Sequence, residues 1–291
     1  MSHAVSAALP ANKSRDELLI IGQDLHIMNP ALQRCVEQRD AEALQAMAKR
    51  QVSAGAHALD LNLGPAKQHI DQLPWAVETI QGAVDVPLFI SSHVLARPEG
   101  LHRHRGTATI NSVTADPAGL ERAMQTAAEH GARLVVLLVR PGLTPFTADE
   151  RLQIAADVLE TARRAGYPVQ DLYLDPLFHI RPDPMTWQLS GGLPDIEAVL
   201  ETLELLPQLS EEKIPTIVAL SSASQFLPSN RRPALHRRLL PMLAAAGLDA
   251  ILLNSRDKTL MQIAADPGLQ PEFFTPLSTE QSTASRVVLP W

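Results

Sequence analysis

The stretch that begins at Leu134 reads Leu134-Val-Val-Leu-Leu-Val139, six apolar residues without a polar interruption. A strand with one face in water alternates apolar and polar residues, whereas a strand buried on both faces does not. Strands buried on both faces belong to parallel sheets that helices cover. This stretch therefore predicts a central strand of a parallel α/β sheet.

Similar short apolar runs recur along the chain, and helical patterns separate them. The expected strands span residues 18–22, 57–61, 87–90, 107–110, 133–139, 172–175, 216–220 and 250–253. The expected helices span residues 41–53, 74–82, 117–130, 148–165, 194–206 and 233–246. Alternating strands and helices pair in parallel, and eight such units in 291 residues fit a single (β/α)₈ TIM barrel. A doubly wound open sheet is the alternative.

The barrel domain is expected over residues 17–270, with a flexible N-terminal segment at 1–16 and a C-terminal tail at 271–291. The first 13 residues lack a long apolar core, so they do not resemble a signal peptide. No apolar run approaches the roughly 20 residues that a membrane span needs.

Composition excludes several classes of function. The chain is 45% hydrophobic and 20% charged, with a net charge of −7, so electrostatics do not favour nucleic acid or an anionic membrane. Its one cysteine, Cys35, excludes an intrachain disulfide and fits a reducing compartment, so we expect a cytoplasmic protein. No Cys or His cluster has the spacing of zinc ligands, so no bound metal is expected.

Polar residues end several of the expected strands. Asp175 closes Leu172-Tyr-Leu-Asp175 just before Pro176, Asn111 follows Ile110, and Asp60 and Asn62 lie two apart in one strand. The carboxyl ends of barrel strands form the floor of the active site. A carboxylate there accepts two adjacent N–H donors, and an amide recognises a heterocycle edge of mixed polarity.

Each of these positions has a structural interpretation as well. Asp175 before proline is a common turn opener, and Asn111 is a plausible strand-end cap. Asp60 and Asn62 together could form a polar layer near the barrel mouth. Arg232, in a basic segment, suits either a surface helix start or a site for a carboxylate or phosphate group.

Several segments together resemble one known family. They are Gly55-Ala-His-Ala-Leu-Asp-Leu-Asn-Leu-Gly-Pro65, Ile110-Asn-Ser112, Ala128-Glu-His-Gly-Ala132, Asp171-Leu-Tyr-Leu-Asp-Pro-Leu177 and Gly247-Leu-Asp-Ala250. The chain resembles the pterin-binding methyltransferases that move a methyl group from methyltetrahydrofolate to the cobalt of a corrinoid protein. That resemblance implies a dihydropteroate synthase-like barrel, a tetrahydrofolate substrate, a corrinoid protein as partner, and a homodimer.

The resemblance also implies roles for particular residues. The family binds the pterin edge with an Asp, an Asn and an Asp, and the last two match Asn111 and Asp175. The first Asp matches Ser91, and an Asn that reaches the methyl-bearing nitrogen matches Ser222. The family glycine near that Asn matches Ala219, and its opening Gly-Glu-Arg-Ile-Asn is replaced by Gly22-Gln-Asp-Leu-His26. Three further positions match the family: Gln225 beside the methyl-bearing nitrogen, Arg232 at the substrate tail, and Arg237.

Two classes of function follow. In the first, the chain is an enzyme whose Ser222 and Gln225 assist methyl transfer, while Asp60, Asn62, Ser91, Asn111, Asp175 and Arg232 bind the pterin. In the second, the replacements at Ser91 and Ser222 mark a non-catalytic paralogue that serves as a binding or scaffolding subunit of a methyl-transfer system. A barrel enzyme for a different heterocycle is a further alternative.

Overall fold

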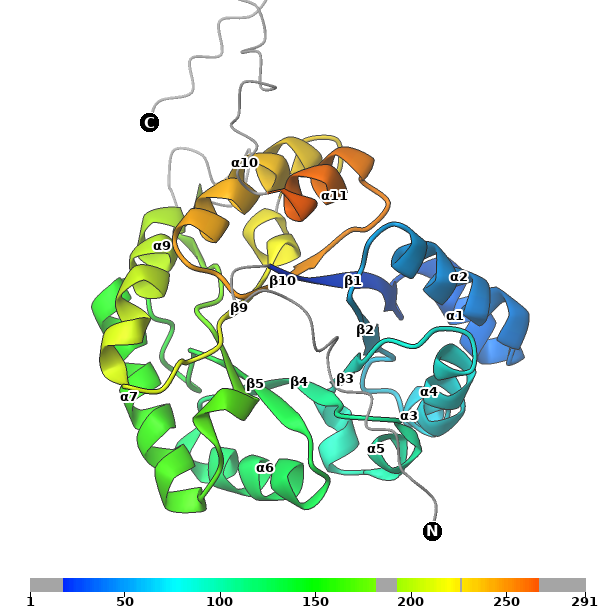
Figure 1. Ribbon diagram of the computed structural model, residues 1–291, viewed down its shortest axis with the longest axis horizontal. Coiled ribbons are helices and arrows are strands. Elements are labelled where there is room, and N and C mark those ends of the chain that lie inside the picture. The colour runs from blue at the N-terminus through cyan, green and yellow to red at the C-terminus, as the bar shows by residue number, and fades with distance from the viewer. Residues whose placement is uncertain (1–17, 182–192, 226, 267–291) are drawn as a thin grey trace, which may run out of the picture.

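The computed structural model describes residues 18–181, 193–225 and 227–266. The expected segment 1–16 and tail 271–291 lie outside the described residues. Eight strands form a central ring in the order β6-β5-β4-β3-β2-β1-β10-β9, with helices around it (Figure 1). All neighbouring pairs are parallel. A parallel bridge between Leu174 on β6 and Thr216, just before β9, closes the ring. The predicted (β/α)₈ barrel is confirmed.

The barrel strands lie where the apolar runs predict them. They are β1 (Leu19–His26), β2 (Ala58–Asn62), β3 (Leu88–Ser91), β4 (Thr109–Thr114), β5 (Arg133–Leu137), β6 (Leu172–Asp175), β9 (Ile217–Ala219) and β10 (Ala250–Leu253). A separate two-stranded antiparallel hairpin joins β7 (Ile180–Arg181) to β8 (Leu193–Pro194).

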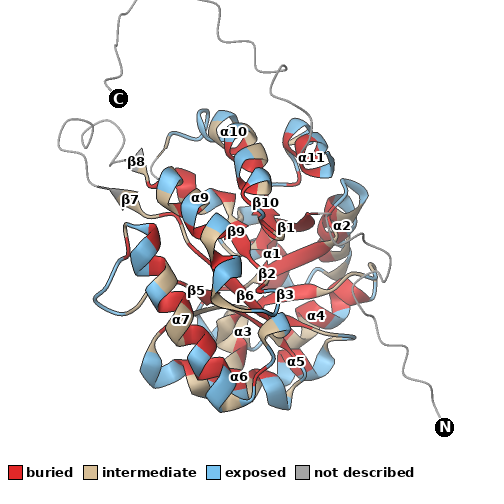
Figure 2. Ribbon diagram, turned by 60° about the vertical axis from the view of Figure 1, so that its left-hand side comes forward, coloured by how far each residue is buried: buried red, intermediate tan, exposed pale blue. Residues whose placement is uncertain are grey.

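The helices cover the outside of the ring, and their buried residues face the strands (Figure 2). They are α1 (Pro30–Gln38), α2 (Ala41–Ser53), α3 (Lys67–Ile70), α4 (Leu73–Gln81), α5 (Glu99–Arg103), α6 (Pro117–Glu129), α7 (Ala148–Ala165), α9 (Ile196–Leu205), α10 (Arg232–Ala245) and α11 (Lys258–Ala265). Short 3₁₀ helices are η1 (Ser92–Leu95), η2 (Val169–Asp171), η3 (Leu206–Leu209) and η4 (Leu220–Ser224). None of these described helices is long and apolar enough to cross a membrane.

The barrel interior is a closed apolar layer. Side chains from β1, β2, β3, β5, β6, β9 and β10 form one buried cluster, in which the rings of Phe89 and Tyr173 lie 5.9 Å apart between centroids. Because side chains alternate along a strand, the residue two positions after an interior residue also faces inward, one layer nearer the carboxyl end. This alternation places the polar strand ends above the apolar layer.

β4 continues four residues past its expected end at Ile110, to Thr114, and β1, which was expected to end at Gly22, likewise continues to His26. The ladder with β2 shifts register between Gly22 and Leu25. The buried side chain of Gln51 supports this irregular stretch, because its Oε1 accepts from the Asp24 amide at 3.0 Å. A Cβ at Gly22 would lie 2.4 Å from that oxygen, so a larger residue there would displace the end of the Gln51 side chain. Polar support from a neighbouring helix is invisible to a search for apolar runs.

Candidate functional site

The carboxyl ends of β2, β3 and β6 each present one buried polar side chain to the barrel interior. Ala58, Phe89 and Tyr173 belong to the interior cluster. The residues two positions later face the same way, and they are 4–5% exposed: Asp60, Ser91 and Asp175. Asn111, the third residue of β4, lies beside Ser91 in the ladder. The structure therefore brings four of the sequence-predicted residues to one end of the barrel.

Asp60 and Asn111 are joined directly. The Nδ2 of Asn111 donates to Oδ1 of Asp60 at 2.9 Å. Burial raises the pKa of Asp60 to about 6, although the bond from Asn111 opposes that rise. An ionised carboxylate only accepts hydrogen bonds, so the amide nitrogen of Asn111 must face it. The carbonyl oxygen of Asn111 is then left to accept from a ligand.

Asp175 opens a tight turn, as its structural interpretation predicts. Its Oδ1 accepts from the Leu177 amide at 2.7 Å. Burial raises the pKa of Asp175 to about 7, against the opposing effects of the Leu177 amide and the Arg151 cation. A carboxylate has about four lone-pair sites, so the turn leaves acceptor capacity for a ligand. Asp60, Asn111 and Asp175 are called the acceptor cluster below.

Asn62, on the same strand as Asp60, has a different role. Its Oδ1 accepts from the Gly64 amide at 2.9 Å, so the side chain closes the turn after β2. It is half-buried, whereas Asp60 on the same strand is buried. The structure thus gives Asn62 a local role in the loop and leaves the inner position on β2 to Asp60.

Three further predicted residues follow β9, and they are called the β9-loop group below: Ser222, Gln225 and Arg232. The Oγ of Ser222 donates to the carbonyl of Ala219 at 2.6 Å. Arg232 is exposed, and it donates to the carbonyl of Leu227 at 2.9 Å and to that of Gln225 at 3.2 Å. This group therefore holds its own loop together, and none of its three residues is fully buried.

Arg237 forms a separate ion pair. Its guanidinium contacts both carboxylate oxygens of Asp257, with the nearest approach at 2.8 Å. Asp257 is also the N-cap of α11, where its side chain accepts from the Leu260 amide. The arginine thus fixes one helix against another.

The sequence did not predict one buried ion pair. Arg151 on α7 and Asp195 before α9 form an ion pair in which both side chains are fully buried. The guanidinium also donates to the carbonyls of Pro176 and Leu177, in the turn that follows Asp175. An arginine on the apolar face of an otherwise amphipathic helix was the only signal in the sequence, and it did not reveal the partner.

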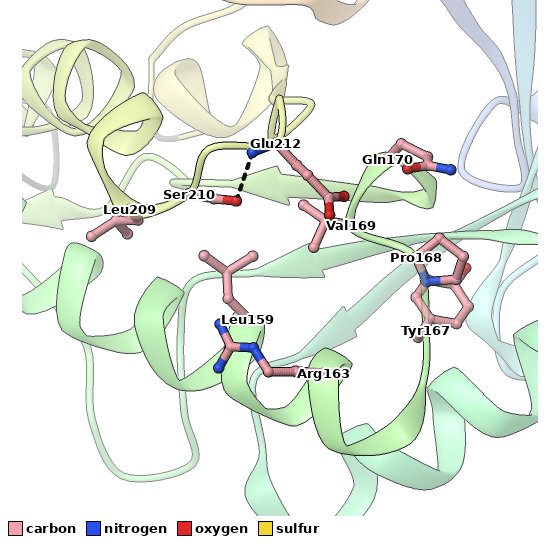
Figure 3. A pocket seen from close by; sticks show the side chains of 9 residues that line it. All are labelled: Leu159, Arg163, Tyr167, Pro168, Val169, Gln170, Leu209, Ser210 and Glu212. Atoms are coloured by element: carbon pink, nitrogen blue, oxygen red, sulfur yellow. Dashed lines mark hydrogen bonds between the residues drawn. The ribbon is translucent and has the colours of Figure 1, made fainter.

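A cavity of about 360 Å³ lies elsewhere on the barrel. Figure 3 shows its lining at the end of α7 and in the segments before β6 and β9, where Ser210 accepts from the Glu212 amide. These segments precede the strands, so the cavity lies at the amino ends of β6 and β9. It is therefore separate from the acceptor cluster. Within residues 18–181, 193–225 and 227–266, no three His, Cys, Asp or Glu side chains are grouped to hold a metal ion.

Comparison with known proteins places this geometry in a family. The profile described as "Pterin binding enzyme" matches residues 32–254. The chain belongs to the pterin-binding enzyme family. A methylcorrinoid:tetrahydrofolate methyltransferase of Eubacterium limosum is 24% identical over 165 residues, which are 55% of this chain and 60% of that protein.

Solved structures of pterin-binding enzymes share the fold. A dihydropteroate synthase of Xanthomonas albilineans with 4-aminobenzoic acid superposes with a TM-score of 0.64 at 16% identity, covering 91% of this chain and 96% of that one. The dihydropteroate synthase of Thermus thermophilus gives 0.60 at 20% identity, covering 87% and 93%. At such identities the likeness supports the dihydropteroate synthase-like barrel and says nothing of the reaction.

Proposed function

We propose that the protein binds a tetrahydropterin at the carboxyl end of the barrel and transfers a methyl group between methyltetrahydrofolate and the cobalt of a corrinoid protein. The Eubacterium limosum relative is named for transfer from a methylcorrinoid to tetrahydrofolate. A catalyst accelerates both directions of a reaction, so the two directions use the same site. The corrinoid partner would dock over the barrel mouth with its cobalt above the pterin.

The observation that carries the proposal is the acceptor cluster. It contains two buried carboxylates with raised pKa values, and one of them, Asp60, accepts from the Asn111 amide. Burial makes the charged form of each carboxylate unfavourable in the folded protein. Groups of this kind concentrate at functional sites. The pyrimidine edge of a pterin presents a ring N–H beside an exocyclic amino group, and such adjacent donors suit Asp175 and the free oxygen of Asn111.

Ser91 makes the acceptor cluster weaker than the family pattern. It is buried beside Asn111, at the position of a family carboxylate. A ligand donor left without a partner there costs about 1–3 kcal/mol, or roughly 5- to 150-fold in affinity. We therefore propose micromolar binding, with Asp175 and the pair of Asp60 and Asn111 providing most of the contact.

The β9-loop group would act at the methyl-bearing nitrogen. The cobalt(I) of the corrinoid attacks the methyl carbon, the C–N bond breaks as the Co–C bond forms, and the electron pair stays on the ring nitrogen, which is then protonated. A hydrogen bond that strengthens as this charge develops lowers the barrier. The Ser222 hydroxyl would supply it by turning away from the Ala219 carbonyl, at a cost of about 0.5–1.5 kcal/mol. Gln225 would assist, and Arg232 would meet the glutamate tail of the folate.

A non-catalytic pterin-binding subunit is the second candidate. The observation that favours it is the Ser222 hydroxyl, which is already satisfied by the backbone at 2.6 Å. In that case the acceptor cluster binds the pterin and no methyl group moves.

The test is methyl transfer from methyltetrahydrofolate to free cob(I)alamin, followed by the absorbance of the corrinoid. Turnover by the parent protein, and its loss in Asp175→Ala, support the enzyme. The matched control is Ser210→Ala, in the cavity at the opposite end, which should leave the rate unchanged. Binding without turnover would support the non-catalytic subunit, and neither binding nor turnover would contradict both.

A further inference from the structure

Arg151 is among the largest fully buried side chains of the protein, yet it is charged. Its partner Asp195 is buried to the same degree. Replacing a buried ion pair by apolar residues of similar size is often neutral or stabilising, because both charges lose their hydration. A contribution to stability therefore does not explain well why this ion pair is present. Its other hydrogen bonds indicate a different role.

The guanidinium of Arg151 reaches the turn that carries Asp175. Its Nε donates to the Pro176 carbonyl at 2.7 Å, and its Nη2 donates to the Leu177 carbonyl at 3.1 Å. The Leu177 amide in turn donates to Asp175 at 2.7 Å. One cation thus fixes two consecutive carbonyls of the turn whose amide orients the carboxylate.

The turn needs such support, because Leu177 has a φ of 48°. This left-handed conformation is unfavourable for a branched side chain and persists where surrounding contacts hold it. Arg151 is itself fixed at the start of α7, where Thr147 and Glu150 form a capping box and Nη1 donates to the Thr147 carbonyl at 3.3 Å. The support is therefore built on the first turn of a helix.

Asp195 ties the same cation to the chain beyond the turn. Its Oδ1 accepts from the His179 amide at 2.8 Å, and its own amide donates to the His179 carbonyl at 3.1 Å. The other carboxylate oxygen meets Nη2 of Arg151. The segment from Asp175 to His179 is thus held by one arginine and one aspartate from two different helical regions.

We propose that Arg151 and Asp195 are positioning residues for Asp175, holding its carboxylate at the angle that a pterin edge requires. This inference rests on the proposed function for its ligand, but its geometric part concerns the free protein. Arginine is needed because a lysine offers a point charge and cannot reproduce the guanidinium fork that serves these four acceptors.

The test compares Arg151→Lys with Val158→Ala. Val158 is a buried core residue seven positions along α7, so its truncation destabilises the same helix without touching the turn. Calorimetric titration with tetrahydrofolate, at a temperature where every variant is folded, should give about 10-fold weaker binding for Arg151→Lys and unchanged binding for Val158→Ala. Amide exchange in the free protein should become faster at Leu177 in Arg151→Lys only.

The outcomes separate this inference from the proposed function. If amide exchange at Leu177 is faster in Arg151→Lys than in the parent, but neither the parent nor any variant binds the pterin, the positioning role is supported and pterin binding is contradicted. A parent that binds, with Arg151→Lys equal to it in affinity and in exchange at Leu177, would overturn the positioning role. Should Arg151→Lys not fold, Asp195→Asn is the second variant, because it keeps an acceptor for the His179 amide and removes the anchor of the guanidinium.

Discussion

On β2 and β6, the carboxylates of Asp60 and Asp175 are buried and their pKa values are raised to about 6 and about 7. In the loop after β9, Ser222 donates to the backbone and exposed Arg232 holds the carbonyls of its own loop. The acceptor cluster is thus unfavourable without a ligand, whereas the β9-loop group is satisfied by itself. We infer that binding is preorganised in this protein and that the transfer step requires rearrangement.

The largest effect is expected from Asp175→Asn. In the proposed complex, it removes the negative charge that accepts from the pterin donors, and a hydrogen bond to a charged group contributes about 1.5–3 kcal/mol, or roughly 10- to 150-fold in affinity. Calorimetric titration with tetrahydrofolate measures the loss. Ser210→Ala at the opposite end of the barrel is the control.

The same variant should be more stable than the parent in alkaline solution. The folded pKa of Asp175, about 7, lies above the ordinary aspartate value of 3.8, so the folded state binds more protons between these values and stability falls as pH rises through them. Asparagine does not titrate. Thermal unfolding should show equal stability near pH 4 and a higher midpoint for Asp175→Asn near pH 8. A lower midpoint near pH 8 would show that the carboxylate contributes more through its turn than it loses through burial.

The pH dependence of binding is the next effect in size. Pterin affinity should fall as pH drops through about 7 and then about 6, because Asp175 and then Asp60 become protonated and lose acceptor capacity. Asp60→Asn should remove the lower step and leave the upper one. A pterin affinity that stays constant from about pH 8 to about pH 5 would show that neither carboxylate contacts the ligand.

A gain of about 10-fold in pterin affinity is expected from Ser91→Asp, which restores a carboxylate beside Asn111. Ser222→Asn alone should leave affinity unchanged, and the double variant should match Ser91→Asp. An equal gain from Ser222→Asn would show that the β9-loop group also determines binding, and it would contradict the contrast drawn between this group and the acceptor cluster.

The smallest effect on binding is expected from Ser222→Ala. It removes one hydroxyl and its bond to the Ala219 carbonyl, so affinity should change by less than about twofold. The rate of methyl transfer to cob(I)alamin should fall in the same variant if Ser222 assists the leaving nitrogen. If the parent protein transfers methyl groups and Ser222→Ala does so at the same rate, a group other than Ser222 assists the leaving nitrogen.

The fold could be predicted from the sequence because its signals are local. The run from Leu134 to Val139 is apolar since β5 is buried on both faces, and each strand carries its own version of that pattern. The polar ends Asn111 and Asp175 were visible for the same reason. What the sequence could not reveal is how the side chains pair across the barrel.

Two pairings illustrate that limit. Asp60 and Asn111 are 51 residues apart, and their bond decides which atom of the amide faces a ligand. Arg151 and Asp195 are 44 residues apart, and the position of Arg151 on the apolar face of its helix does not indicate which residue it pairs with. The orientation of the Ser222 hydroxyl likewise depends on the path of η4. Such features arise from three-dimensional proximity, which a strand-by-strand pattern does not contain.

The most direct measurement is calorimetric titration of the purified protein with methyltetrahydrofolate, near pH 8, beside Asp175→Ala. We predict micromolar binding for the parent and no detectable binding for Asp175→Ala. No heat of binding from a parent whose circular dichroism shows a folded barrel would contradict the assignment of the acceptor cluster to a pterin.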